Sequence, residues 1–194
     1  MDKRKAAVEE TRRRIVEATL ALHAEKGTFG TSWQDIAKRA DVSVGTVYKH
    51  FPSLDELVPA CGELVFAISQ PPSLEDAPQI FAEANSLEER LGRLVSEFFG
   101  FYERGESYLD IDFQERKLPA VQEWVAHMRA TREGLAREAL RPLDPDERTV
   151  RALGALLDFP LFKSFRLHDV PKAEAEEIVN AMLLCWIGER RGGR

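Results

Sequence analysis

The chain has 194 residues, of which 44% are hydrophobic and 31% are charged, and its net charge is −6. This length and composition suit one large globular domain or two small ones, and they argue against a disordered chain. The longest apolar run, residues 181–187, is far shorter than the roughly 20 residues of a membrane span, and the charged N-terminus lacks the apolar core of a secretory signal. We therefore expect a soluble, cytoplasmic protein without a membrane partner.

The net charge hides an asymmetry along the chain. Residues 1–52 contain ten Lys and Arg against seven Asp and Glu, whereas residues 53–194 contain seventeen against twenty-six. The basic surplus lies in two runs, Lys3–Lys5 and Arg12–Arg14. Such runs are either solvated helix ends or part of a nucleic-acid-binding surface, and charge alone leaves both interpretations open.

Apolar residues recur with helical spacing along almost the whole chain, and no sustained alternation predicts a strand. In the first 69 residues the pattern predicts four helices, at about residues 9–26, 33–39, 44–50 and 55–69. Gly27 is expected to end the first helix, and Thr31 or Ser32 to cap the second. A turn at residues 40–42 follows, and Ser43 is expected to cap the third helix.

Residues 70–78 contain three prolines and predict a linker. Beyond this linker, the apolar spacing predicts further helices at about residues 87–101, 106–116, 121–135, 146–168 and 172–190. Pro160 falls inside one of the two long final helices and should kink it, because proline removes a backbone donor. The sequence therefore predicts an all-α fold, with a three-helix N-terminal domain (residues 1–53) and a bundle-like C-terminal domain (residues 54–194).

The third predicted helix, Val44–His50, is a poor helix by itself, since it makes only about two turns and contains two valines, a threonine and a glycine. Val42, Val47 and Phe51 would pack against the first two helices and supply the missing stability. The opposite side carries the polar side chains, which are Thr46, Tyr48, Lys49 and His50. Their hydroxyl, ammonium and imidazole groups are of the kind that phosphates and base edges accept.

Two helices joined by a tight three-residue turn match the helix-turn-helix motif, whose second helix enters the major groove of DNA. Gly45 would let the backbone approach a phosphate, and Ser43 with free backbone amides could bind another. The candidate DNA-binding residues are Thr31, Ser32, Ser43, Val44, Gly45, Thr46, Tyr48, Lys49 and His50.

The stretch Thr31–Val58 resembles the DNA-binding signature of the TetR family of bacterial transcriptional regulators. The matching positions are Thr31, Ile36, Ala37, Ala40, Val42, Ser43, Gly45, Thr46, Tyr48, His50, Phe51, Ser53 and Leu57. The resemblance implies a homodimeric repressor that binds a palindromic operator in double-stranded DNA. It also implies that a small-molecule effector binds the C-terminal domain and releases the DNA, and that the last two long helices form the dimer interface.

Three positions depart from the family signature. Asp41 stands where glycine is usual and must therefore tolerate a left-handed backbone, which aspartate can do. Val44 replaces a residue that is often polar or basic, and Leu54 replaces a common lysine. The loss of these polar groups leaves an alternative open, in which the protein keeps the fold and binds a small molecule but binds DNA weakly or not at all.

Aromatic and neighbouring residues of the C-terminal domain are candidates for a ligand pocket, although an aromatic stripe on a helix is also typical of a plain core. The candidates are Phe66, Phe98, Phe101, Tyr102, Phe113, Trp124, His127, Met128, Phe159 and Phe162. The last two helices carry apolar faces too broad for packing within one chain. The candidates for the dimer interface are Leu153, Leu156, Leu157, Met182, Leu183 and Trp186.

No enzyme signature is present. The four histidines have no metal-ligand spacing, and the chain has no GxSxG or phosphate-binding loop motif after a strand. Cys61 and Cys185 lie far apart in the sequence and predict neither a disulfide framework nor a zinc site. We expect a protein that is not an enzyme and needs no metal or other cofactor.

Overall fold

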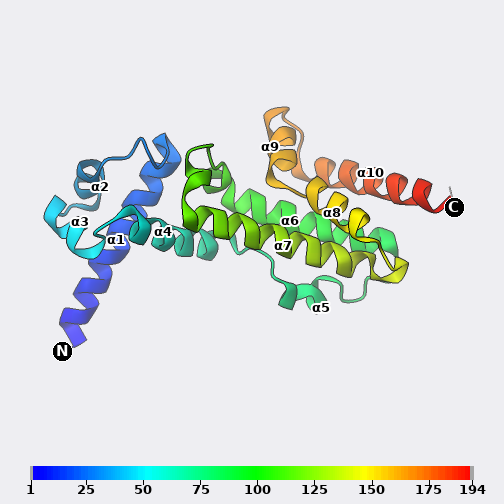
Figure 1. Cartoon of the computed structure of the whole chain (residues 1–194), viewed down its shortest axis with the longest axis horizontal. Helices are drawn as coiled ribbons and strands as arrows, with labels where there is room; N and C mark the ends of the chain where they lie inside the picture. The colour runs from blue at the N-terminus through cyan, green and yellow to red at the C-terminus, as the bar shows by residue number, and fades with distance from the viewer. Residues whose placement is uncertain (1, 193–194) are drawn as a thin grey trace. The chain divides into compact units, whose positions relative to one another are not determined.

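The computed structural model describes residues 2–192, and all regular structure in this range is helical (Figure 1). The chain divides into two compact units. The first unit contains the residues up to Ser69 together with Ser107–Trp124, and the second contains Gln70–Glu106 and the residues from Val125 onward. Within residues 2–192, no helix combines the length and the apolar character needed to cross a membrane.

Four helices open the first unit, namely α1 (Asp2–Lys26), α2 (Trp33–Ala40), α3 (Val44–His50) and α4 (Leu54–Ser69). The predicted bounds of α3 are confirmed, and those of α2 and α4 are right to within one residue. α1 begins seven residues before the predicted Glu9, because the intervening residues are mostly alanine, lysine and arginine, which favour helix. Residues 3–10 are all exposed, and Figure 1 shows these first turns of α1 extending away from α2 and α3.

The core of the first unit lies between α1, α2, α3 and α4. Val47 of α3 and the adjacent Phe51 are completely buried there, and Val42 packs against the same core. Burial of two such side chains is worth about 1.5–3 kcal/mol each, which compensates for the low helix propensity of α3. The sequence-based prediction for these three residues is confirmed.

Local capping sets the geometry around α2 and α3. The Ser32 Oγ accepts the Asp35 N–H at 3.1 Å, while the Asp35 carboxylate accepts the Ser32 N–H at 3.2 Å, so the two residues form a capping box. Asp41 ends α2 with φ 53° and ψ 53°, the left-handed conformation predicted for it. Ser43 caps α3, because its Oγ accepts the Thr46 N–H at 3.1 Å.

The segment Ser107–Trp124 also belongs to the first unit. Its Tyr108 packs against the core of that unit. Its Glu115 accepts the N–H of Thr28, at the end of α1, at 2.8 Å. The predicted helix at about 106–116 is wrong, since residues 106–109 complete α6 and only Glu115–Lys117 form a 3₁₀ turn.

The second unit is built around two helices that run side by side in Figure 1, α6 (Leu87–Leu109) and α7 (Pro119–Leu140), each of which ends or begins in the first unit. The buried Arg90 of α6 donates to the carbonyls of Ala139 and Glu138 at the end of α7, at 3.0 and 2.6 Å. The remaining elements are η1 (Leu74–Asp76), α5 (Ala77–Ile80), η3 (Arg141–Leu143), α8 (Glu147–Leu156), α9 (Phe159–Leu167) and α10 (Lys172–Gly192). The predicted linker at 70–78 thus contains a short helical turn.

The predicted long helix at 146–168 is also wrong, because the chain breaks it into α8 and α9 at Leu157 and Asp158. Pro160 lies in the first turn of α9, where the N–H that proline lacks would have no helical partner, so it starts a helix instead of kinking one. Asp158 caps this helix by accepting the Phe159 N–H at 2.9 Å. The predicted boundary between an N-terminal domain (residues 1–53) and a C-terminal domain (residues 54–194) is a statement about function, and it stays a prediction.

The left-handed turn gives a first stability prediction. Asp41→Val should lower the free energy of unfolding by about 1–2 kcal/mol, because a β-branched residue fits φ 53° poorly. Asp41→Gly should keep the free energy of unfolding within about 1 kcal/mol of the original value, since glycine adopts this conformation without a Cβ clash. Urea denaturation followed by circular dichroism would measure both, and an Asp41→Val variant as stable as the original protein would contradict the argument.

Candidate nucleic-acid interface

The side of α3 opposite its buried face is accessible to solvent. Tyr48 is 45% exposed, Lys49 is exposed, and Thr46 and His50 are half-buried. Among the described residues, Lys49 forms neither an ion pair nor a hydrogen bond. Its charge is therefore available to a partner outside the chain.

Tyr48 is positioned by an aromatic neighbour from α2. The rings of Tyr48 and Trp33 have centroids 4.9 Å apart and planes inclined by 30°, and Trp33 itself packs against the core. This contact restricts the Tyr48 ring, although the residue as a whole stays accessible to a partner. Trp33 was not among the predicted site residues, although an aromatic at the first position of α2 was a visible signal.

Gly45 has no packing reason to be glycine. A Cβ added there would meet only the Ser43 Oγ, at an ordinary 3.8 Å, and the residue is exposed. The Ser43 hydroxyl, in contrast, is already engaged by the Thr46 N–H and by the Thr46 Oγ1 at 2.8 Å. A close approach of an external group is therefore better supported at Gly45 than at Ser43.

The remaining predicted residues have partners within the chain. Thr31 donates its hydroxyl to the Gly27 carbonyl at 2.9 Å, and the Ser32 hydroxyl donates to the Asp35 carboxylate at 2.7 Å. Lys26 also contacts this carboxylate at 2.6 Å, and together with Ser32 it lowers the pKa of Asp35. Val44 is half-buried and packs against the core. Thr31, Ser32 and Val44 therefore help to hold α2 and α3 in place, in addition to lying at the edge of the candidate interface.

The two basic runs differ in their environment. Arg12 lies over the ring of Phe51 at 4.3 Å, Arg14 donates to the Asp41 carbonyl at 3.5 Å, and Arg13 pairs with glutamates of its own helix. Lys3–Lys5, in contrast, are exposed on the free first turns of α1. The Arg12–Arg14 run therefore supports the fold, and the Lys3–Lys5 run remains accessible.

The candidate pocket residues fall in both units. In the second unit, Phe98, Phe101, Phe159 and Phe162 surround Tyr102 with ring centroids 5.0–6.1 Å from it, and Met128 is buried. In the first unit, Phe66 and Trp124 meet edge to face at 6.3 Å. Phe113 is 74% exposed beneath Lys117, and His127 of the second unit is exposed. Neither of these two side chains is enclosed by the chain.

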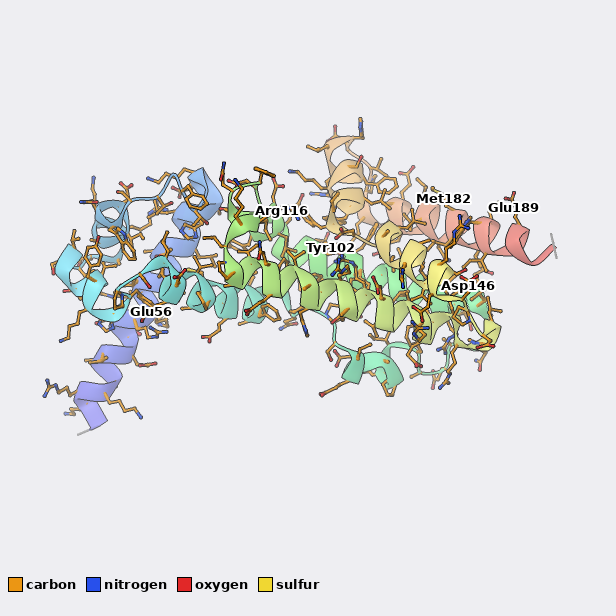
Figure 2. All side chains as sticks on the ribbon, in the orientation of Figure 1. Glu56, Tyr102, Arg116, Asp146, Met182 and Glu189 are labelled. Carbon is orange, nitrogen blue, oxygen red and sulfur yellow. The ribbon has the colours of Figure 1, made fainter. Side chains whose placement is uncertain are left out.

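The candidate dimer-interface residues include both buried and exposed side chains. Leu153, Leu157 and Leu183 lie in the chain's own core. Leu156 is exposed, Met182 is 56% exposed on α10 (Figure 2), and Trp186 is half-buried. Only the last three have surface left for a second subunit, and their role stays a prediction.

A short helix held by its buried face, joined to the preceding helix by a left-handed turn and presenting polar side chains outward, has the geometry of a helix-turn-helix motif. Residues 15–61 match the family model described as "Bacterial regulatory proteins, tetR family". Residues 15–61 therefore match the TetR family, and the predicted resemblance is confirmed. The repressor KstR of Rhodococcus jostii (strain RHA1) is 49% identical over 47 residues, which are 24% of this chain and only 22% of that repressor.

Solved structures resemble the chain over both units. The multidrug binding protein EbrR complexed with ethidium is 26% identical, with a TM-score of 0.57 over 89% of this chain and 95% of that chain. EbrR complexed with imidazole has a TM-score of 0.64 at 24% identity, over 89% of this chain and 87% of that chain. The predicted fold class, an N-terminal helix-turn-helix followed by a larger helical domain, is confirmed.

Gly45→Ala should separate DNA binding from stability. Alanine should raise the free energy of unfolding by about 0.5–1 kcal/mol, because it favours helix and meets no close neighbour. Affinity for operator DNA should nevertheless fall about tenfold or more, a cost of about 1.4 kcal/mol. Gly62→Ala on α4 is a matched control, since a Cβ there meets nothing within 4 Å and one at Gly45 meets only an ordinary contact at 3.8 Å. Unchanged affinity in the Gly45→Ala variant would exclude a close approach.

Lys49→Ala should weaken DNA binding about tenfold without loss of stability, because Lys49 has no partner among the described residues, whereas Lys49→Arg should keep most of the affinity. For Tyr48, the informative change is Tyr48→Phe, which removes the hydroxyl and preserves the contact with Trp33. Fluorescence anisotropy with labelled operator would measure these affinities. Equal affinity of Lys49→Ala and the original protein would remove Lys49 from the interface.

Proposed function

We propose that this protein is a transcriptional repressor that binds a palindromic operator as a homodimer and leaves the DNA when a small-molecule effector binds its C-terminal domain. The observation that carries the proposal is the accessible polar side of α3, held in place by the buried Val47 and Phe51, in a TetR-family domain. α3 enters the major groove of each half-site. The protein acts in the cytoplasm and is not an enzyme.

Dimerisation follows from the small size of one α3. A single seven-residue helix reads few base pairs, so two subunits reach half-sites about 34 Å apart on one face of the DNA. The exposed apolar side chains Leu156 and Met182 support an interface built from α8 and α10. Effector binding then favours a conformation in which the two copies of α3 no longer match that spacing.

The relatives support the regulatory part of the proposal. KstR is named as a repressor, and EbrR is a multidrug binding protein seen with ethidium. The alternative, a ligand-binding protein that has lost DNA binding, rests on Val44 and Leu54. Both side chains pack against the core of the first unit, so packing accounts for their apolar character and the alternative loses its main support.

Selection of bound sequences from a random pool of double-stranded DNA tests the proposed function. The full chain should enrich an inverted repeat whose half-sites lie one helical turn apart. The Lys49→Ala variant, processed in parallel, should enrich it less. Failure of the full-length dimer to enrich any sequence would instead favour the ligand-binding alternative.

The affinity for the selected operator should depend steeply on salt. If each half-site makes about four phosphate contacts, the slope of log affinity against log salt should be about −7. Substitution of Lys3, Arg4 and Lys5 by glutamine should make this slope shallower if the first turns of α1 contact phosphates. A nearly flat salt dependence would contradict phosphate-mediated binding.

A further inference from the structure

A cluster of aromatic side chains surrounds a tyrosine in the second unit. The Tyr102 ring lies 5.0 Å from Phe101 and 5.5 Å from Phe159, measured between centroids. Figure 2 labels Tyr102 on α6, inside the bundle. Its hydroxyl donates to the carbonyl of Leu157 at 2.6 Å, and burial is the main cause that raises the pKa of Tyr102. The cluster therefore has a polar centre at the point where α8 ends.

A buried guanidinium lies beside this hydroxyl. Arg132 of α7 is only 9% exposed, and it forms an ion pair with Asp158 at 3.1 Å. Its positive charge also partly opposes the rise in the pKa of the Tyr102 phenol, whose main cause is burial. Its Nε, however, has no hydrogen-bond partner among the described residues. A buried unpaired donor on a charged group is costly, so this N–H is poised for an oxygen acceptor that the chain does not supply.

The helical structure is interrupted beside Arg132, between the end of α8 and the start of α9. Between α8 and α9, the Leu157 carbonyl is taken by Tyr102, and the Asp158 side chain is 46% exposed. The next residue, Phe159, is only partly buried, unlike the fully enclosed Phe98 and Phe162. Phe159 is therefore the least enclosed ring of the cluster.

We infer that this cluster is the effector site, and that its ligand is an aryl carboxylate whose ring replaces that of Phe159 while its carboxylate accepts the Arg132 Nε–H. The inference rests on the proposed function, since it names the chemical class of the effector. The remaining rings supply the aromatic surface that a planar ligand needs. Charge-assisted pairing with a guanidinium gives the carboxylate its orientation.

The charges of the site favour an anion over a cation. Aromatic rings alone would also attract a cation, but Arg132 places a positive charge within the cluster. Asp158 already serves the Arg132 ion pair and the N–H of Phe159. A cationic ligand would therefore meet the like charge of Arg132 and would have to compete with it for the Asp158 carboxylate.

Calorimetric titration with benzoate tests the inference on the full chain without DNA. Phe159→Ala should bind benzoate at least tenfold more tightly than the original protein, because the ring no longer has to be displaced. Arg132→Gln combined with Phe159→Ala should lose at least tenfold of that affinity. Benzylamine should not bind either variant. Because no DNA is present, the outcome is independent of whether the protein represses transcription.

Toluene is the control for a cavity that binds any apolar molecule. It should bind Phe159→Ala with and without Arg132→Gln equally, whereas benzoate should distinguish them. Equal benzoate affinity in these two variants, or tighter binding of benzylamine than of benzoate, would overturn the inference. Phe159→Leu and Arg132→Lys provide milder variants if the first pair does not fold, as judged by circular dichroism. Arg132→Lys keeps the charge but lacks the Nε–H, and it should also bind benzoate more weakly.

Discussion

The first unit depends on the burial of one side of a seven-residue helix. α3 contains residues that form helices poorly, and Val47 and Phe51 hold it in place by filling the core below. Two cations of α1 reinforce this arrangement from outside, since Arg12 covers the Phe51 ring and Arg14 donates to the carbonyl of the left-handed Asp41. A helix fixed by its buried face keeps its other face accessible, and the exposed side chains of α3 owe their orientation to contacts on the buried side.

The two units place their polar groups differently. In the first unit, the polar side chains of α3 are available at the surface, and the arginines that could have joined them are used for packing. In the second unit, Tyr102 and Arg132 lie inside the bundle, where the break between α8 and α9 leaves a carbonyl and a carboxylate for them to meet. Polar side chains on an exposed surface suit the binding of a large anionic polymer. Polar side chains inside a helical bundle suit the binding of a small molecule, which loses its water when it enters.

Local features of the fold were predictable from sequence because their causes lie within a few residues. The capping box of Ser32 and Asp35, the left-handed Asp41 and the bounds of α3 all depend on neighbours in the chain. The break at Asp158 is also encoded locally, since aspartate followed two residues later by proline is typical of a helix start. The apolar spacing continues across it, however, and by itself predicts one uninterrupted helix.

Contacts between distant residues were not predictable in the same way. The contact of Arg12 with Phe51 joins α1 to the residue that follows α3, and a run of three arginines gives no sign of which one turns inward. The unpaired Nε of Arg132 depends on the exact packing of three helices. Aromatic residues at helical spacing indicated the cluster around Tyr102, but not which of them would be enclosed, since periodicity reports the face of a helix and not its neighbours.

The segment Ser107–Trp124 has a consequence for how such a protein can be divided. A fragment that ends at Ser69 would lack Tyr108 from the core and the Glu115 carboxylate that accepts the Thr28 N–H. The first unit is thus discontinuous in the sequence, although α3 ends at residue 50. Recombination that exchanged only the N-terminal coding region between relatives would bring together halves of one core that had not evolved together.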